Sequence, residues 1–161
     1  LDIVGDGPER AALEELSRRL GLGSDVQFHG FLSQEGCRRQ LEHDDIFVLP
    51  SLHECGGAAV LESMAAGVPV IAANWGGPAD YLTGDYGVLV EPNEDYIENL
   101  RTAIIELSTD REHREQLAAA ARQRVQDEFD WEAKGRQMLK VYERIARGGT
   151  GGTGSASVSV S

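Results

Sequence analysis

Short apolar runs alternate with amphipathic stretches along most of the chain. The runs occupy residues 1–4, 26–28, 45–49, 68–73 and 87–90. Runs this short and continuous are typical of strands covered on both faces, as in a parallel sheet. Between them, apolar residues recur every three or four positions, which predicts helices. The pattern therefore predicts an α/β fold, a Rossmann-like parallel sheet with crossover helices.

The amphipathic stretches predict where these helices lie. One should follow Pro8 and end at Gly21, and Ser33 should cap a short one that runs to about Glu42. A helical turn is expected over 79–82, and three helices should follow Pro92. We expect their apolar stripes to form the core: Leu13, Leu16 and Leu20; Ile97, Leu100, Ile104 and Leu107; Leu117, Ala121, Val125 and Phe129; and Trp131, Met138, Leu139, Tyr142 and Ile145.

The stretch from Pro50 to Ala72 joins two of the strands and holds the candidate chemistry. Glu54 lies in the predicted loop, Gly56 and Gly57 stand where a helix begins, and Glu62 lies inside that helix. Ligands of open α/β sheets bind in the crevice beyond the carboxyl ends of the strands. Amides at a helix start favour an anionic group, because their N–H donors and the helix dipole both attract it.

Composition narrows the classes of partner. The 161 residues include 15 Lys and Arg against 27 Asp and Glu, a net charge of −12. No basic cluster is present, so we expect no nucleic-acid partner. No run reaches the roughly 18 apolar residues of a transmembrane helix, and Cys37 and Cys55 form no disulfide framework or spaced zinc motif. We therefore expect a cytoplasmic protein; for the full-length protein, a peripheral position at the inner membrane face stays open.

Several motifs, taken in order, resemble the C-terminal half of a GT-B glycosyltransferase of retaining family 4, the group 1 glycosyl transferases. The central motif is the Glu54-x7-Glu62 pair with the run Leu61-Glu62-Ser63-Met64-Ala65-Ala66-Gly67-Val68-Pro69. Beside it stand Val4-Gly5-Asp6-Gly7-Pro8, Val26-Gln27-Phe28-His29-Gly30, Gly76-Gly77-Pro78-Ala79-Asp80 and Phe129-Asp130-Trp131. Together these motifs cover residues 1 to about 146.

The resemblance implies a nucleotide-sugar donor site. Glu54 would contact the transferred sugar as the catalytic residue, and Glu62 would hold the ribose hydroxyls. Gly56, Gly57 and Ala58 would present amides to the sugar and diphosphate, and Gly30, Phe31 and Leu32 would lie near the base. The implied activity is hexose transfer, with retention, to a glycan or lipid-linked acceptor in polysaccharide or glycoconjugate biosynthesis. No cofactor is expected, and no metal, because the sequence has no aspartate-rich metal motif.

The resemblance also implies that an N-terminal domain is absent from this chain. In the family, that domain binds the acceptor, and an Arg and a Lys on the segment before Leu1 neutralise the diphosphate. We therefore expect the isolated chain to show no glycosyl transfer. Cys55 and Gly56 replace the family's glycine and bulky aromatic after the first glutamate. The resemblance therefore leaves open which sugar is accepted.

Other interpretations stay open at this point. The same fold hosts nucleotide-sugar epimerases, and the chain could instead be a non-catalytic subunit that works with a separate N-terminal partner. Gly5 and Gly7 resemble a phosphate loop only weakly, because a lone Gly-x-Gly is common. Trp75 is expected to be a packing anchor of its loop rather than a stacking platform.

The last residues have a different composition. We predict a nucleotide-sugar-binding domain over residues 1–147 and a flexible Gly/Ser/Thr-rich tail over residues 148–161.

Deleting residues 148–161 is expected to leave the melting temperature unchanged within error. The segment has too few apolar side chains to offset the entropy of ordering it. Thermal unfolding followed by circular dichroism checks this, and a drop of several degrees in the truncated chain would contradict it.

Overall fold

The computed structural model of the chain describes residues 1–148. In order, it contains β1 (Asp2–Val4), α1 (Arg10–Arg19), the 3₁₀ turn η1 (Gly23–Asp25), β2 (Gln27–Gly30), α2 (Gln34–Leu41), β3 (Phe47–Leu49), α3 (Ala58–Ala66), β4 (Val70–Ala73), α4 (Gly77–Tyr81), β5 (Val88–Val90), α5 (Tyr96–Thr109), α6 (Arg111–Arg124), the π-helical η2 (Val125–Phe129) and α7 (Trp131–Gly148). The predicted tail lies outside the described residues, except for Gly148.

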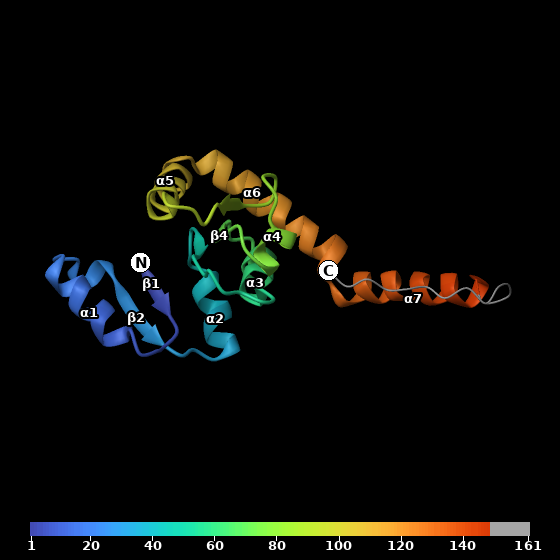
Figure 1. The fold of residues 1–161 in the computed structure, drawn as a ribbon, viewed down its shortest axis with the longest axis horizontal. Helices are drawn as coiled ribbons and strands as arrows, with labels where there is room; N and C mark the ends of the chain where they lie inside the picture. Colours follow the sequence, from blue (N-terminus) through green and yellow to red (C-terminus); the bar gives the residue numbers. More distant parts are fainter. Residues whose placement is uncertain (149–161) are drawn as a thin grey trace.

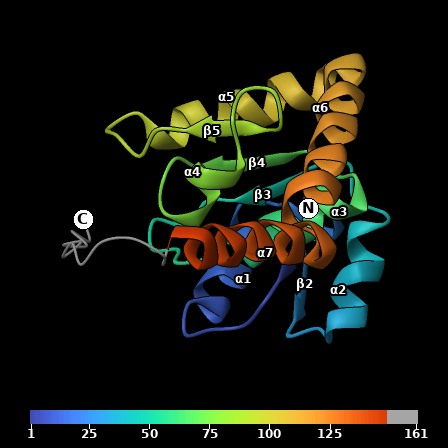
Figure 2. The same ribbon diagram turned by 90° about the vertical axis from the view of Figure 1, so that its right-hand side faces the viewer.

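The five strands pair in parallel, as predicted, but they divide into two sheets. β1 pairs with β2, and β3, β4 and β5 form a second sheet with β4 in the middle. The second sheet lies between α5 on one side and α3 and α4 on the other (Figures 1 and 2). Hydrophobic periodicity shows that a run is a strand and does not show which strand lies beside it, so this division could not be predicted.

The core is built on both faces of β4, whose four residues are all buried. Val70 and Ala72 pack with Val60 and Met64 of α3. Ile71 faces the other way, into a cluster that includes Leu107 of α5. Successive side chains of a strand point to opposite faces, so a continuously apolar strand is the sequence that this two-sided cover requires.

The bend between α6 and α7 is held by aromatic and cationic side chains. Phe129 of η2 meets Tyr81 of α4 edge-on, with ring centroids 5.3 Å apart. The Arg124 guanidinium lies 4.4 Å from the ring centroid of Tyr86, and the Lys134 ammonium lies 4.5 Å from that of Phe129. These contacts fix the direction in which α7 leaves the rest of the chain (Figure 1).

The predicted core stripes are only partly buried, so this expectation was wrong for two helices. α1 has no buried residue, and Leu13, Leu16 and Leu20 are exposed. On α7, the stripe of Trp131, Met138, Leu139, Tyr142 and Ile145 is exposed as well. By contrast, Leu107, Leu117 and Ala121 are buried. An amphipathic pattern predicts that a helix has an apolar face. It does not indicate whether other parts of residues 1–148 pack on that face.

Two loops at the carboxyl ends of β3 and β4 press against each other through glycines. A Cβ added at Gly76 would lie 2.0 Å from the carbonyl oxygen of Glu54, and one added at Gly77 would lie 2.7 Å from the carbonyl of Gly56. Gly76 also has φ 61° and ψ −145°, a conformation largely restricted to glycine. Only residues without a side chain allow this contact.

Gly76→Ala is expected to lower the free energy of unfolding by at least about 1–3 kcal/mol, the usual cost of such a backbone conformation. The clash with the Glu54 carbonyl adds to this. Gly84→Ala is the matched control: its Cβ would meet nothing within 4 Å and its φ is not positive, so it should change stability by about 0.5 kcal/mol or less. Urea unfolding followed by circular dichroism measures both, and equal stabilities of the two variants would refute the prediction.

Candidate functional site

The side chain of Glu54 folds back onto the backbone that follows it. Its Oε1 accepts hydrogen bonds from the amides of Gly57 at 2.9 Å and Gly56 at 3.3 Å. Within residues 1–148, no hydrogen bond uses its Oε2. Hydrogen bonds from amides to a carboxylate are charge-assisted and directional. One oxygen of Glu54 is therefore fixed and the other is available.

The first turn of α3 presents unused donors beside this carboxylate. Gly57 caps the helix with a left-handed backbone, and the amide of Val60 donates to its carbonyl at 2.8 Å. No hydrogen bond of the described residues uses the amides of Ala58 or Ala59. Such first-turn amides, together with the positive end of the helix dipole, attract an anion. Ala58 was among the site residues predicted from the sequence. Ala59 was not, although its position in the first turn of the predicted helix indicated it.

Glu62 lies four residues after Ala58, on the same side of α3. It is exposed and lines a groove of about 670 Å³ between α2 and α3. Gln34, Glu35 and Arg38 line the facing side. Arg38 donates to Glu35 at 2.8 and 3.0 Å and pairs with Glu42. The hydrogen bond from Arg38 holds the pKa of Glu35 below its ordinary value, so Arg38 is already paired with carboxylates.

The residues predicted to lie near a base are the last residue of β2 and the two residues that follow it, before α2. Gly30 is buried with φ 68°, and its carbonyl accepts from the Gly5 amide at 2.8 Å. Phe31 is exposed and Leu32 is half-buried. The next element is α2, whose first residue, Gln34, lines the groove with Glu62. Residues 30–32 therefore precede the helix that lines the groove together with Glu62, while Glu54 lies just before the helix that bears Glu62.

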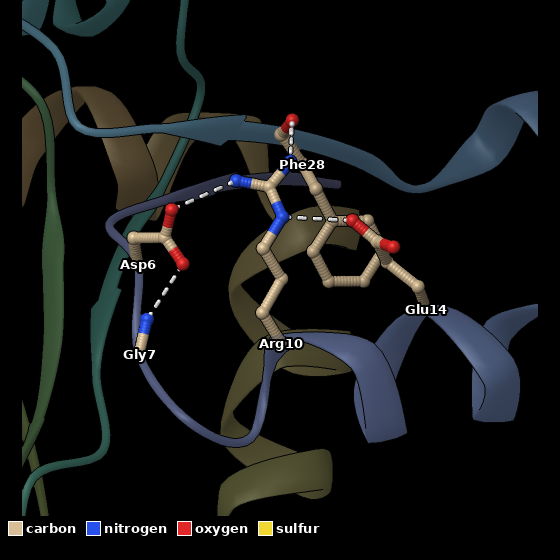
Figure 3. Close-up of polar contacts among 5 residues, drawn as sticks. All are labelled: Asp6, Gly7, Arg10, Glu14 and Phe28. Atoms are coloured by element: carbon tan, nitrogen blue, oxygen red, sulfur yellow. Dashed lines mark hydrogen bonds and ion pairs between the residues drawn. The ribbon is translucent and has the colours of Figure 1, made fainter.

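The loop after β1 is held by Arg10, as Figure 3 shows. The guanidinium donates to Glu14 at 2.8 Å, to the Phe28 carbonyl at 3.2 Å and to Asp6 at 3.4 Å. These contacts, chiefly the hydrogen bond to Glu14, raise the pKa of Arg10 above its ordinary value. Asp6 in turn accepts from the Gly7 amide at 2.8 Å. Arg10 therefore holds the loop after β1 against β2. Because its guanidinium is used in these contacts, it is not available to bind a phosphate.

Trp75 is not the packing anchor that was predicted. Its side chain is 51% exposed, whereas an anchor would be buried. The loop is instead held by backbone contacts of Gly76 and Gly77.

Neither a metal-ion site nor a membrane-spanning helix is present among residues 1–148. No group of three or more His, Cys, Asp or Glu side chains in this part of the chain is arranged to hold a metal ion. None of the described helices combines the length and the apolar character needed to cross a bilayer.

Comparison with known sequences places these residues in a family. Residues 1–124 match the family described as Glycosyl transferases group 1. The chain is 38% identical over 137 residues to sulfoquinovosyl transferase SQD2 of Arabidopsis thaliana, covering 81% of this chain and 25% of that protein. It is 31% identical to glycogen synthase of Mycobacterium tuberculosis, covering 92% of this chain and 36% of that protein. The chain spans 24% to 40% of the length of the curated relatives that it matches first.

Solved structures share the fold. Sucrose-phosphate synthase of Thermosynechococcus elongatus superposes with a TM-score of 0.77 at 31% identity, over 92% of this chain and 39% of that one. HepE of Anabaena, in complex with UDP and glucose, superposes with a TM-score of 0.71 at 26% identity, over 89% and 40% of the two chains. The C-terminal domain of the group 1 protein LpcC of Francisella tularensis gives 0.69 at 25% identity, over 76% and 63%.

The α/β arrangement is that of the C-terminal half of GT-B glycosyltransferases, as the sequence motifs indicated. The family match extends from the first residue through α6 and includes Glu54, Glu62 and the glycines that hold their loops together. The chain belongs to the group 1 glycosyl transferases.

Proposed function

We propose that the chain is the donor-binding half of a retaining glycosyltransferase of family 4. The full-length protein would move a hexose from a nucleotide diphosphate to a glycan or a lipid-linked acceptor. The observation that supports this most directly is the pairing of Glu54, with one oxygen fixed and the other free, with the unused amides of Ala58 and Ala59. A carboxylate accepts hydrogen bonds from sugar hydroxyls, and helix amides donate hydrogen bonds to the oxygens of a diphosphate.

In this proposal, each part of such a donor meets a different group of the chain. The free Oε2 of Glu54 would accept from the transferred sugar. The amides of Ala58 and Ala59 would donate to the diphosphate. Glu62, one turn further along α3, would accept from the ribose hydroxyls in the groove. Residues 30–32, which come just before the helix on the facing side of that groove, would lie near the base.

Gly56 and Gly57 receive a more specific role in this proposal. From the sequence, their amides were expected to face the ligand. In the structure they donate to Glu54, so they would position the carboxylate, and the next two amides would hold the phosphates. A fixed carboxylate loses little entropy when substrate binds, which is the advantage of preorganisation.

The names of the relatives support the same class of reaction. One structural neighbour was solved with UDP-glucose, and one relative is described as a GDP-mannose-dependent mannosyltransferase. The developing negative charge of the leaving diphosphate would be stabilised by preorganised amides. No observation favours the epimerase or the non-catalytic subunit.

In the full-length protein, Glu62→Gln is expected to weaken the binding of the free nucleoside diphosphate. The ribose hydroxyls would donate to Glu62 in ground and transition states alike, so its loss removes uniform binding and raises KM more than it lowers kcat. Calorimetry with UDP and GDP measures the binding. Glu106→Gln on α5, across the sheet from the groove, is the matched control and should bind like the parent chain.

Glu54→Gln is expected to lower kcat of the full-length protein by about one to two decades. This corresponds to the roughly 1.5–3 kcal/mol of a charge-assisted hydrogen bond, since the carboxylate would also stabilise positive charge at the anomeric carbon. Affinity for the free nucleoside diphosphate should stay near that of the parent, because that probe lacks the sugar. If Glu54→Gln abolishes nucleotide binding and Glu62→Gln preserves it, the roles of the two carboxylates are reversed.

A further inference from the structure

Trp75 is a large aromatic side chain without a partner. It is 51% exposed, and among residues 1–148 no ring contact, cation contact or hydrogen bond involves its indole. An aromatic side chain buries some 150–250 Å² when it is packed, and an indole N–H usually finds an acceptor. About half of the surface of Trp75 is therefore left uncovered, and its indole N–H has no acceptor among the described residues.

The backbone that bears Trp75 is nevertheless fixed. The Asn74 amide donates to the Val90 carbonyl at 2.9 Å, and the Asn74 side chain hydrogen-bonds to Glu91. The Trp75 amide donates to the Ala73 carbonyl at 2.8 Å. Trp75 directly follows the residue that is tied to the end of β5, so its exposure is not that of a loose loop.

The position of Trp75 is next to the candidate site. The following residue, Gly76, lies directly against the carbonyl of Glu54, and Gly77 lies against Gly56. A fixed, exposed aromatic residue thus adjoins the segment that holds a carboxylate with one free oxygen. Small-molecule sites combine apolar and aromatic surface with a few placed polar groups in this way.

These observations identify the chemistry that would suit Trp75. A hexose presents hydroxyls at its edge and C–H groups on its ring faces, and the C–H hydrogens carry partial positive charge. The face of an indole carries partial negative charge. Of the two loops in contact, one therefore offers a carboxylate that suits the hydroxyls of a saccharide ring and the other an indole that suits a C–H face.

We propose that Trp75 is a stacking platform for the transferred sugar of the donor and thereby contributes to donor-sugar specificity. The proposal rests on the proposed function, because it uses Glu54 as the residue that meets that sugar. It assigns Trp75 a contact that the nucleoside diphosphate alone cannot make.

The test uses the two tryptophans of the chain, Trp75 and Trp131. In the Trp131→Phe variant of the 161-residue chain, Trp75 is the sole source of tryptophan fluorescence. Its quenching by acrylamide is measured with saturating UDP-glucose or GDP-mannose, with UDP or GDP alone, and with maltose. Calorimetry on the same samples records binding.

The expected result is that a bound sugar nucleotide protects Trp75 from acrylamide, whereas the matching nucleoside diphosphate does not. Protection by UDP or GDP alone would overturn the proposal, as would a bound sugar nucleotide that leaves quenching unchanged. In either case nucleotide binding, and with it the proposed function, would stand. If maltose protects Trp75 and neither sugar nucleotide does, Trp75 contacts the acceptor. This outcome would overturn the donor role. If the 161-residue chain binds no nucleotide, calorimetry on the full-length protein decides, and absence of nucleotide binding there would overturn both proposals.

Substitution of Trp75 gives a second measurement. Trp75→Ala should lower the affinity for the sugar nucleotide by about threefold to tenfold, the range that follows from measured aromatic contacts, and leave that for the nucleoside diphosphate unchanged. Trp75→Phe should retain most of the affinity, because it keeps a ring. Trp131→Ala, at a position 91% exposed on α7, is the control. Equal losses for both probes would indicate a merely structural role and overturn the proposal.

Discussion

The close contact between two glycine-containing loops determines the geometry of the site. Gly76 and Gly77 lie against the backbone of residues 54–56 with no room for a Cβ. This contact joins the carboxyl ends of β3 and β4 and holds the segment that turns into α3. Because that segment is held, the amides of Gly56 and Gly57 are placed where they meet the carboxylate of Glu54. The orientation of Glu54 and the access to the first turn of α3 both depend on residues that have no side chain.

Much of the architecture could be predicted because it depends on short-range patterns. The runs at 45–49 and 68–73 were predicted as strands, since a strand buried on both faces must be apolar throughout. The glycine pair at 56–57 located the start of α3, with Glu54 before it and Glu62 within it. A strand, a turn and a helix are specified mainly by neighbouring residues, so a single sequence contains their signals.

The features that could not be predicted depend on contacts between residues that are distant in the sequence. The hydrogen bonds of Glu54 depend on a side-chain rotamer, and the exposure of Trp75 depends on which residues, distant in the sequence, lie beside it. Neither appears in the local pattern. The stripes of α1 and α7 show the converse case: their periodicity predicted the helices correctly, while their burial depends on partners that periodicity cannot reveal.

β4 and α7 differ in burial, and they should therefore differ in the free energy needed to open their backbone hydrogen bonds. β4 is enclosed on both faces, so its amide protons should exchange with solvent only when the whole domain unfolds. Most of the apolar stripe of α7 lies open to water, and helices in proteins draw most of their stability from packing such a face. Its amides should exchange through local fraying, orders of magnitude faster than those of β4. Any surface that covers the stripe of α7 would slow that exchange, so exchange at α7 would report directly on its docking.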